Sequence, residues 1–149
     1  MSVLSRLAKP TPDTPFHIDV SWWDGQIRDF HSELRELAHK FGLEIPESAR
    51  HETIDSIDPL TAQVTTISAL QYLVQTQCGN HPEFVNGNMS LVDAVFRALL
   101  KNGNHPMTPL QLAESIGRPN QVDTILRTLG SRQVYKGIRP IELVRNSRN

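Results

Sequence analysis

The strongest constraint on the fold is the stretch from Ser90 to Ile141, where three short helices are predicted in close succession. Apolar residues recur at helical spacing in each of them. Each helix begins with a residue that can cap its free N–H groups and ends with a glycine that can close it, in the order Ser90 and Gly103, Thr108 and Gly117, Asn120 and Gly130. The start of the second helix has the clearest signals, because a proline follows Thr108 and a glutamine completes a capping box.

A short β-hairpin is predicted directly after the third helix. β-forming residues lie on both sides of Lys136-Gly137, and this glycine can take the positive φ that a tight turn needs. Pro140 cannot donate a backbone hydrogen bond, so the second strand is expected at an edge of its sheet. Residues 105–107 form a further extended piece between the first two helices. The sequence therefore predicts the order helix, extended piece, helix, helix, hairpin.

In this order and these lengths, residues 90–141 resemble the winged-helix superfamily, whose members carry a winged helix-turn-helix. The segment GNHPMTPLQLAESIG is similar to domains of the HARE type, as in the delta subunit of bacterial RNA polymerase. There too, a short strand with a Pro-Met-like pair leads into a capped helix. The resemblance implies a winged helix over residues 90–144, which is a module that binds nucleic acid or a protein partner.

The clearest amphipathic helix in the first half of the chain is predicted from Ser21 to Phe41. Its apolar positions step by three and four residues, and they are Trp23, Ile27, Phe30, Leu34, Leu37 and Phe41. Ser21 with Asp24 forms the expected N-cap pair, and Gly42 ends the helix. A stripe of this kind usually faces the core, so the charged opposite face is expected in solvent.

Shorter elements surround this helix. Residues 16–20 alternate between apolar and polar side chains, residues 61–67 are rich in β-branched ones, and each segment predicts a short strand. The polar, acidic segment 44–61 is expected to be an irregular loop. A further helix is predicted to begin at Ser68 and end at Gly79.

The expected fold class is mostly α within the α+β class, with an N-terminal helical lobe and a C-terminal winged helix-turn-helix. The expected divisions are a flexible leader (1–15), the helical lobe (16–79), a hinge (80–89), the winged-helix domain (90–144) and a tail (145–149). The two strands predicted in the first half can also pair with each other or with the hairpin, which would join the whole chain into one α+β unit. We expect two lobes that share an interface.

No pattern of an enzyme or a metal site stands out, so we expect a non-enzymatic protein without a cofactor. The six histidines show no HExxH or His-x-His pattern, and Cys78-x-x-His81 lacks the second pair that zinc sites usually show. No glycine-rich phosphate loop occurs. With one cysteine there is no internal disulfide, and no apolar run reaches the roughly 20 residues of a membrane span, so a cytoplasmic location is expected.

Charge is distributed unevenly along the chain, although its net value is only −1. Residues 118–149 hold seven of the fifteen basic residues and two of the sixteen acidic ones. This excess coincides with the third helix and the hairpin, which contact DNA in a winged helix, so nucleic acid, as duplex DNA, is the first expected partner. The expected nucleic-acid-binding residues are Arg118, Asn120, Gln121, Thr124, Arg127, Thr128, Arg132, Lys136 and Arg139. Asp123 lies on the same helix and would repel phosphates.

A protein-interaction module is the alternative, in which the chain is a small accessory subunit of a larger nucleic-acid-handling complex. The acidic N-terminal half and two adjacent tryptophans at a predicted helix start favour it. Trp22 lies off the apolar stripe and is the residue expected to bind such a partner. A homodimer is a third alternative. A continuous basic surface over the third helix and the hairpin would favour DNA, whereas dispersed arginines with an exposed apolar patch would favour a protein partner.

Overall fold

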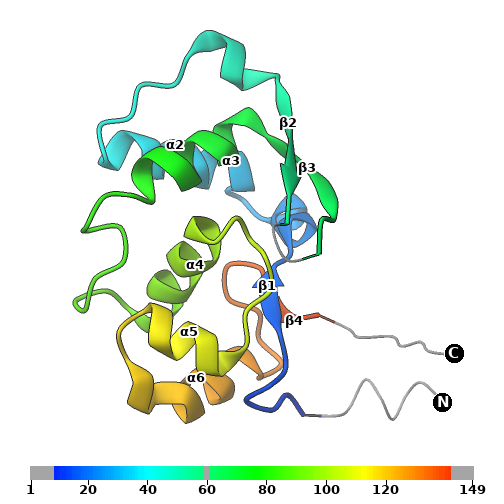
Figure 1. Cartoon of the computed structure of the whole chain (residues 1–149), viewed down its shortest axis with the longest axis vertical. Coiled ribbons are helices and arrows are strands. Elements are labelled where there is room, and N and C mark those ends of the chain that lie inside the picture. The colour runs from blue at the N-terminus through cyan, green and yellow to red at the C-terminus, as the bar shows by residue number, and fades with distance from the viewer. Residues whose placement is uncertain (1–8, 59–60, 142–149) are drawn as a thin grey trace, which may run out of the picture.

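Three helices in the second half of the chain appear in the predicted order. The computed structural model describes residues 9–58 and 61–141, and the structural statements below refer to these residues. Helices α4 (Leu91–Lys101), α5 (Pro109–Ser115) and α6 (Val122–Leu129) follow one another in the lower half of Figure 1.

Most of the predicted ends of these helices are confirmed. The Ser90 hydroxyl accepts a hydrogen bond of 3.2 Å from the N–H three residues on, and Thr108 and Gln111 form a reciprocal capping box. Gly103 and Gly117 both have a φ of +72°, the left-handed conformation that ends a helix. The local signals in this part of the sequence therefore predict the real helix boundaries.

The predicted cap at Asn120 is wrong. Pro119 fixes the start of a 3₁₀ turn, η4 (Pro119–Gln121), and Asn120 lies inside this turn rather than before a helix. Gln121 occupies the N-cap position of α6, and its side chain makes no capping hydrogen bond. Helix α6 therefore begins at Val122 rather than at Asn120.

The tight turn at Lys136-Gly137 is confirmed, but the strand after it has a different partner from the one expected. Both residues have positive φ values, 53° and 76°, and the Ile138 N–H donates to the Tyr135 carbonyl at 3.0 Å. Strand β4 (Ile138–Pro140) then pairs in antiparallel register with β1 (Phe16–Ile18). The predicted ribbon is thus shortened to one antiparallel bridge between Tyr135 and Ile138, and the turn brings β4 next to a strand from the start of the chain.

Strand β1 joins the two halves of the chain. It lies between β4 and Met107, because Phe16 and Met107 exchange backbone hydrogen bonds of 2.8 and 2.9 Å. Ile18 lies opposite Ile138 across the β1–β4 pair, and both side chains are buried. The strand predicted near residues 16–20 therefore pairs with the strand after the hairpin turn.

The long helix predicted over residues 21–41 is wrong in its first part. A 3₁₀ turn, η1 (Val20–Gly25), is followed by a loop and then by helix α2 (Phe30–Lys40). The carboxylates of Asp19 and Asp29 each accept a hydrogen bond from a backbone N–H, so each segment has its own N-cap. The predicted Ser21 cap is therefore replaced by Asp19.

The apolar stripe of that predicted helix is broken at one position. Ile27 falls in the loop between η1 and α2 and has a relative exposure of 109%. Trp23, Phe30 and Leu34 are buried, as a core-facing stripe requires. Helical spacing predicts the buried residues on both sides of the break, but it cannot detect a loop that preserves the spacing by coincidence.

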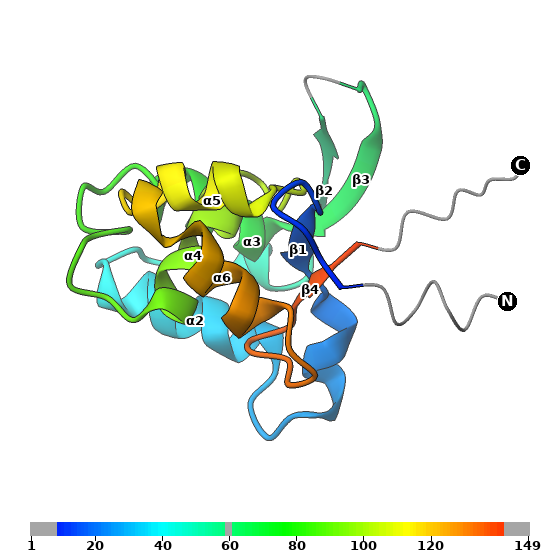
Figure 2. The same ribbon diagram turned by 90° about the horizontal axis from the view of Figure 1, so that it is seen from below.

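The acidic segment expected to be an irregular loop contains a strand. After a 3₁₀ turn, η2 (Glu47–Arg50), strand β2 (Thr53–Ile57) pairs antiparallel with β3 (Val64–Ser68). Figure 2 shows this β2–β3 hairpin projecting from the body of the molecule. The loop prediction is wrong because Asp55 lies on an exposed part of the strand, where its charge stays solvated and strand pairing is undisturbed.

The helix predicted from Ser68 to Gly79 is confirmed. Helix α3 (Ala69–Leu73) continues as a π-helical turn, η3 (Val74–Cys78). The Ser68 hydroxyl accepts a hydrogen bond of 3.0 Å from the Gln71 N–H.

The buried core takes side chains from every part of the described chain. In Figure 1, α2 and α3 lie above α4, and α5 and α6 lie below it. One cluster of buried apolar residues spans these layers and includes Phe16, Leu34, Val74, Phe96, Leu112 and Ile125. With its helices and two small antiparallel sheets the structure belongs to the α+β class, and the division into two lobes stays a prediction. In the described part of the chain, no helix has both the length and the apolar character needed to cross a membrane.

Candidate nucleic-acid interface

The nine residues expected to bind nucleic acid lie on η4, α6, the loop after α6, the turn at Lys136-Gly137 and β4. The structure divides them into two sets. Three charged residues, Arg118, Lys136 and Arg139, make contacts inside the protein. The other six remain on an exposed surface and are described after these three.

Arg118 contacts the segment that precedes α4. Its guanidinium donates to the carbonyl oxygen of Met89 at 2.6 Å and to that of Gly87 at 3.5 Å. These bonds tie the expected hinge to the start of η4. Arg118 therefore has a structural role, because it holds the segment before α4 against the start of η4.

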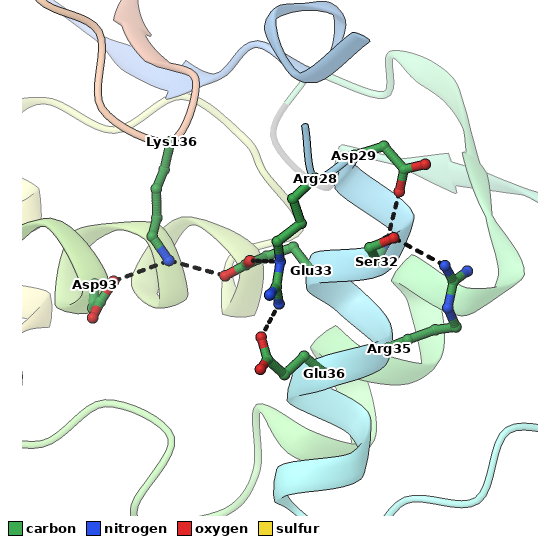
Figure 3. Close-up of polar contacts among 8 residues, drawn as sticks. All are labelled: Arg28, Asp29, Ser32, Glu33, Arg35, Glu36, Asp93 and Lys136. Atoms are coloured by element: carbon green, nitrogen blue, oxygen red, sulfur yellow. Dashed lines mark hydrogen bonds and ion pairs between the residues drawn. The ribbon is translucent and has the colours of Figure 1, made fainter. Parts of the chain in front are cut away.

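Lys136 points toward the body of the protein. Figure 3 shows its ammonium between two carboxylates, with Nζ 2.9 Å from Glu33 Oε2 and 3.0 Å from Asp93 Oδ1. The same nitrogen lies 5.2 Å from the ring centroid of Phe96. Lys136 is therefore the centre of a small ionic cluster that links α2, α4 and the turn.

The electrostatics of this cluster favour charged carboxylates. Partial burial acts to raise the pKa of Asp93, but the hydrogen bond and the charge of Lys136 outweigh it, and the pKa of Asp93 is lowered. Arg28 adds a second cation, 3.1 Å from Glu33 Oε1 and also paired with Glu36 (Figure 3). The cluster holds three carboxylates against these two cations, so its charges require no external anion.

Arg139 is paired across the β1–β4 sheet edge. Its Nε lies 3.4 Å from Asp19 Oδ2, at an angle that makes the contact ionic without forming a hydrogen bond. The pKa of Asp19 is lowered, mainly because its carboxylate accepts a hydrogen bond from the Ser21 hydroxyl. Burial acts to raise this pKa, and the charge of Arg139 acts to lower it. Arg139 therefore already has a carboxylate partner.

The remaining six candidates form one surface, called here the α6 face. Their side chains make no hydrogen bond or ion pair with any described residue, and they are Asn120, Gln121, Thr124, Arg127, Thr128 and Arg132. Five of them recur three to four residues apart on η4 and α6 and so share one side of these elements, and Arg132 lies in the loop that follows α6. The two arginines are exposed and the two threonines are half-buried. Asp123 is exposed beside them.

A neighbour of the α6 face was missed in the sequence. Pro10 lies against the end of α6, because a Cβ placed on Gly130 would be 3.2 Å from Pro10 Cγ. Lys9, which comes directly before it, is exposed. Residues 9–15 of the expected leader thus run between β1 and the end of α6 and place a lysine at that end of the helix. No local sequence signal predicts a contact between positions so far apart.

Metal and thiol chemistry gain no support from the described residues. They contain no group of three or more His, Cys, Asp or Glu side chains placed to hold a metal ion. Burial raises the pKa of the Cys78 thiol, which lies inside the apolar core.

Trp22, the residue expected to bind a protein partner, is half-buried. Its ring stacks edge-on against Trp23, with ring centroids 5.2 Å apart. Trp23 is buried, and its indole nitrogen has no hydrogen-bond partner among the described residues. Part of Trp22 therefore stays available at the surface, and the other part supports the core.

No protein-family model, no curated protein and no solved structure matches this chain.

Proposed function

We propose that the protein is a non-enzymatic, winged-helix-type protein that binds nucleic acid, as duplex DNA, through the α6 face. The observation that carries the proposal is the division of the nine candidates. The side chains of the candidates on η4, α6 and the loop after α6 have no hydrogen-bond or ion-pair partner among the described residues, whereas Arg118 before them and Lys136 and Arg139 after them are engaged within the protein. Unengaged amides and guanidinium groups on one helix face are the groups that read base edges in the major groove.

Each side chain of the α6 face has a defined part in this proposal. Asn120 and Gln121 lie in η4, directly before α6, and offer amides that pair with adenine. Arg127 on α6 and Arg132 in the loop after α6 are suited to phosphates. The turn at Lys136-Gly137 takes no part, because its lysine is held by Glu33 and Asp93.

The small number of free cations limits the expected affinity. If Arg127 and Arg132 each neutralise one phosphate, the slope of log affinity against log salt is about −2. Such binding is weak at physiological salt. We therefore propose that the protein acts in the cytoplasm as an accessory subunit, whose DNA contact adds to the contacts of a larger complex.

The test is fluorescence anisotropy of labelled duplex DNA, titrated with the protein at several salt concentrations. Arg127→Ala and Arg132→Ala should each weaken binding and reduce the salt slope by about one. Arg50→Ala is the matched control, since Arg50 is an exposed arginine on η2, away from α6. The proposal fails if the wild type does not bind at about 50 mM salt, or if the control weakens binding as much as the two variants do.

A second candidate function is a protein-interaction module. The observation in its favour is the exposed Ile27, which lies in the loop directly after η1 and its half-buried Trp22. Large apolar side chains on a loop tip are typical anchors for a partner protein. If this function holds, a partner that co-purifies with the wild type should be lost from Ile27→Asp, while the thermal stability of the two proteins stays equal. Retention of the partner by Ile27→Asp would remove the loop from consideration.

A further inference from the structure

The β2–β3 hairpin is attached to the body at its base, next to helix α3. It projects from the body (Figure 2), and an isolated two-stranded sheet is marginally stable in water. Ile57 and Val64 lie directly opposite each other near its tip. Their relative exposures are 62% and 56%, so a cross-strand pair of β-branched residues faces solvent.

The hydrogen bonds of the hairpin show which backbone groups point outward. Asp58 donates to the Gln63 carbonyl and Ala69 donates to the Glu52 carbonyl. By alternation, Thr65 and Ile67 bond to β2, and the backbone groups of Val64 and Thr66 point away from it. No backbone hydrogen bond from another described segment reaches this outer edge of β3. It is therefore an open template for one more strand.

The two outer edges of the hairpin differ in charge. No Asp, Glu, Lys or Arg occurs in the sequence between Asp58 and Glu83, a segment that contains all of β3. Strand β2 instead carries Asp55, with Glu52 just before it. Natural edge strands are usually protected by charges, prolines or bulges, and β3 has none of the first two. Depletion of charge is also the compositional signature of an interface core.

We infer that the outer edge of β3 is a self-association surface, which pairs antiparallel with β3 of a second copy of the chain. A two-fold axis at Thr66 places Val64 opposite Ser68 of the second copy and Thr66 opposite itself. Both copies then contribute to one four-stranded sheet in the order β2, β3, β3, β2. Like charges never meet across this contact, because β3 carries no charge.

A second copy fits this edge for two reasons. The strand reads Val-Thr-Thr-Ile-Ser, so small hydroxyl and β-branched side chains lie on each side of its centre and suit an isologous pairing. The corresponding pairing through β2 would bring Asp55 of one copy toward Asp55 of the other, which opposes it. In this pairing the exposed Ile57 and Val64 of both copies lie on the same face of the four-stranded sheet, with Val64 beside Ser68 of the second copy.

The test measures the mass of the full chain by light scattering and sedimentation over a range of concentrations. The wild type should reach the mass of a dimer. Thr66→Lys places two cations at the two-fold axis and should raise the dimer dissociation constant about tenfold or more, which is 1.4 kcal/mol. Asp55→Lys is the matched control, since Asp55 is paired with Thr66 on the same rung but belongs to the other edge, and its dimer should be retained.

Other outcomes overturn the inference. A wild type that stays monomeric at all accessible concentrations excludes a dimer. A dimer that survives Thr66→Lys, or one that Asp55→Lys weakens equally, excludes β3 as the contact. If Thr66→Lys does not fold, judged by its helical circular dichroism, Val64→Lys gives the same test because the Val64 backbone also points to the outer edge.

Discussion

Lys136→Met separates a structural role of this lysine from a role in nucleic-acid binding. Methionine keeps most of the aliphatic length of lysine, and it occupies the same positive φ, so the backbone contributes little to the difference. The substitution removes the charge that lies 2.9 Å from Glu33 and 3.0 Å from Asp93. Two carboxylates then share a site with no lysine between them, with Arg28 still next to Glu33.

The expected loss follows from the geometry of the cluster. Partly exposed ion pairs contribute about 0.2–1 kcal/mol each. This range applies because the side chain of Lys136 keeps a relative exposure of 32%, so the larger losses of fully buried ion pairs are not expected. The contact with the Phe96 ring adds about 0.5–1 kcal/mol. The free energy of unfolding should therefore fall by about 1–3 kcal/mol.

Urea denaturation followed by circular dichroism measures this loss as a lower midpoint at an unchanged slope. Arg132→Met is the control, because this exposed residue has no described partner and its substitution should change stability by less than about 0.5 kcal/mol. The pKa of Asp93 is lowered in the folded state, so its share of the stability is present above about pH 3.9 and is lost as the pH falls through the folded pKa. A variant as stable as the wild type that has lost DNA affinity would refute the reasoning, because the lysine would then act at the nucleic acid.

Three further predictions concern the turn, the first strand and α6. Gly137→Ala should lower the free energy of unfolding by about 2–4 kcal/mol in thermal or urea denaturation. The φ of Gly137 is +76°, and a Cβ there would lie 2.8 Å from the Asp19 carbonyl oxygen. A loss below about 1 kcal/mol, roughly the strain of the positive φ alone, would mean that the close contact relaxes. Burial lowers the pKa of His17, so the unfolded state takes up a proton first as the pH falls. The free energy of unfolding should therefore decrease below about pH 6.5. His17→Thr should flatten this dependence of stability on pH, and an unchanged slope would contradict the prediction. Ile125→Ala should cost about 2–5 kcal/mol because the side chain is fully buried, whereas Leu126→Ala should cost clearly less because Leu126 is half-buried; equal losses would contradict the packing of α6.

The sequence predicts those parts of the fold that short-range signals determine. Capping residues predict the starts of α4, α5 and α3, and the glycine after Lys136 predicts the tight turn. These features depend on residues within about four positions of one another, so a single sequence contains all the information they need. The start of α6 is missed because one proline shifts the backbone into a 3₁₀ turn before the helix.

Long-range partners are the part that the sequence does not predict. Lys136 and Glu33 are 103 positions apart, and either residue alone has the appearance of a solvated surface charge. The same holds for Arg118, whose partners are carbonyl oxygens that any residue could supply. The position of the candidate site along the chain therefore stays a prediction, and the availability of its cations depends on tertiary contacts that the sequence does not show.

The insertion of β1 explains why the α6 face and the hairpin turn differ in availability. A strand beside β4 draws the end of the turn toward Asp19, whose N–H donates to the Gly137 carbonyl at 2.7 Å. The turn therefore lies next to α2 and α4, where Lys136 forms ion pairs with Glu33 and Asp93 (Figure 3). Among the described residues, no strand crosses the outer side of helix α6, and Pro10 contacts this helix only near Gly130 at its end. If the protein binds DNA as proposed, the position of β1 therefore predicts a footprint of one helix without a contact from the turn at Lys136-Gly137.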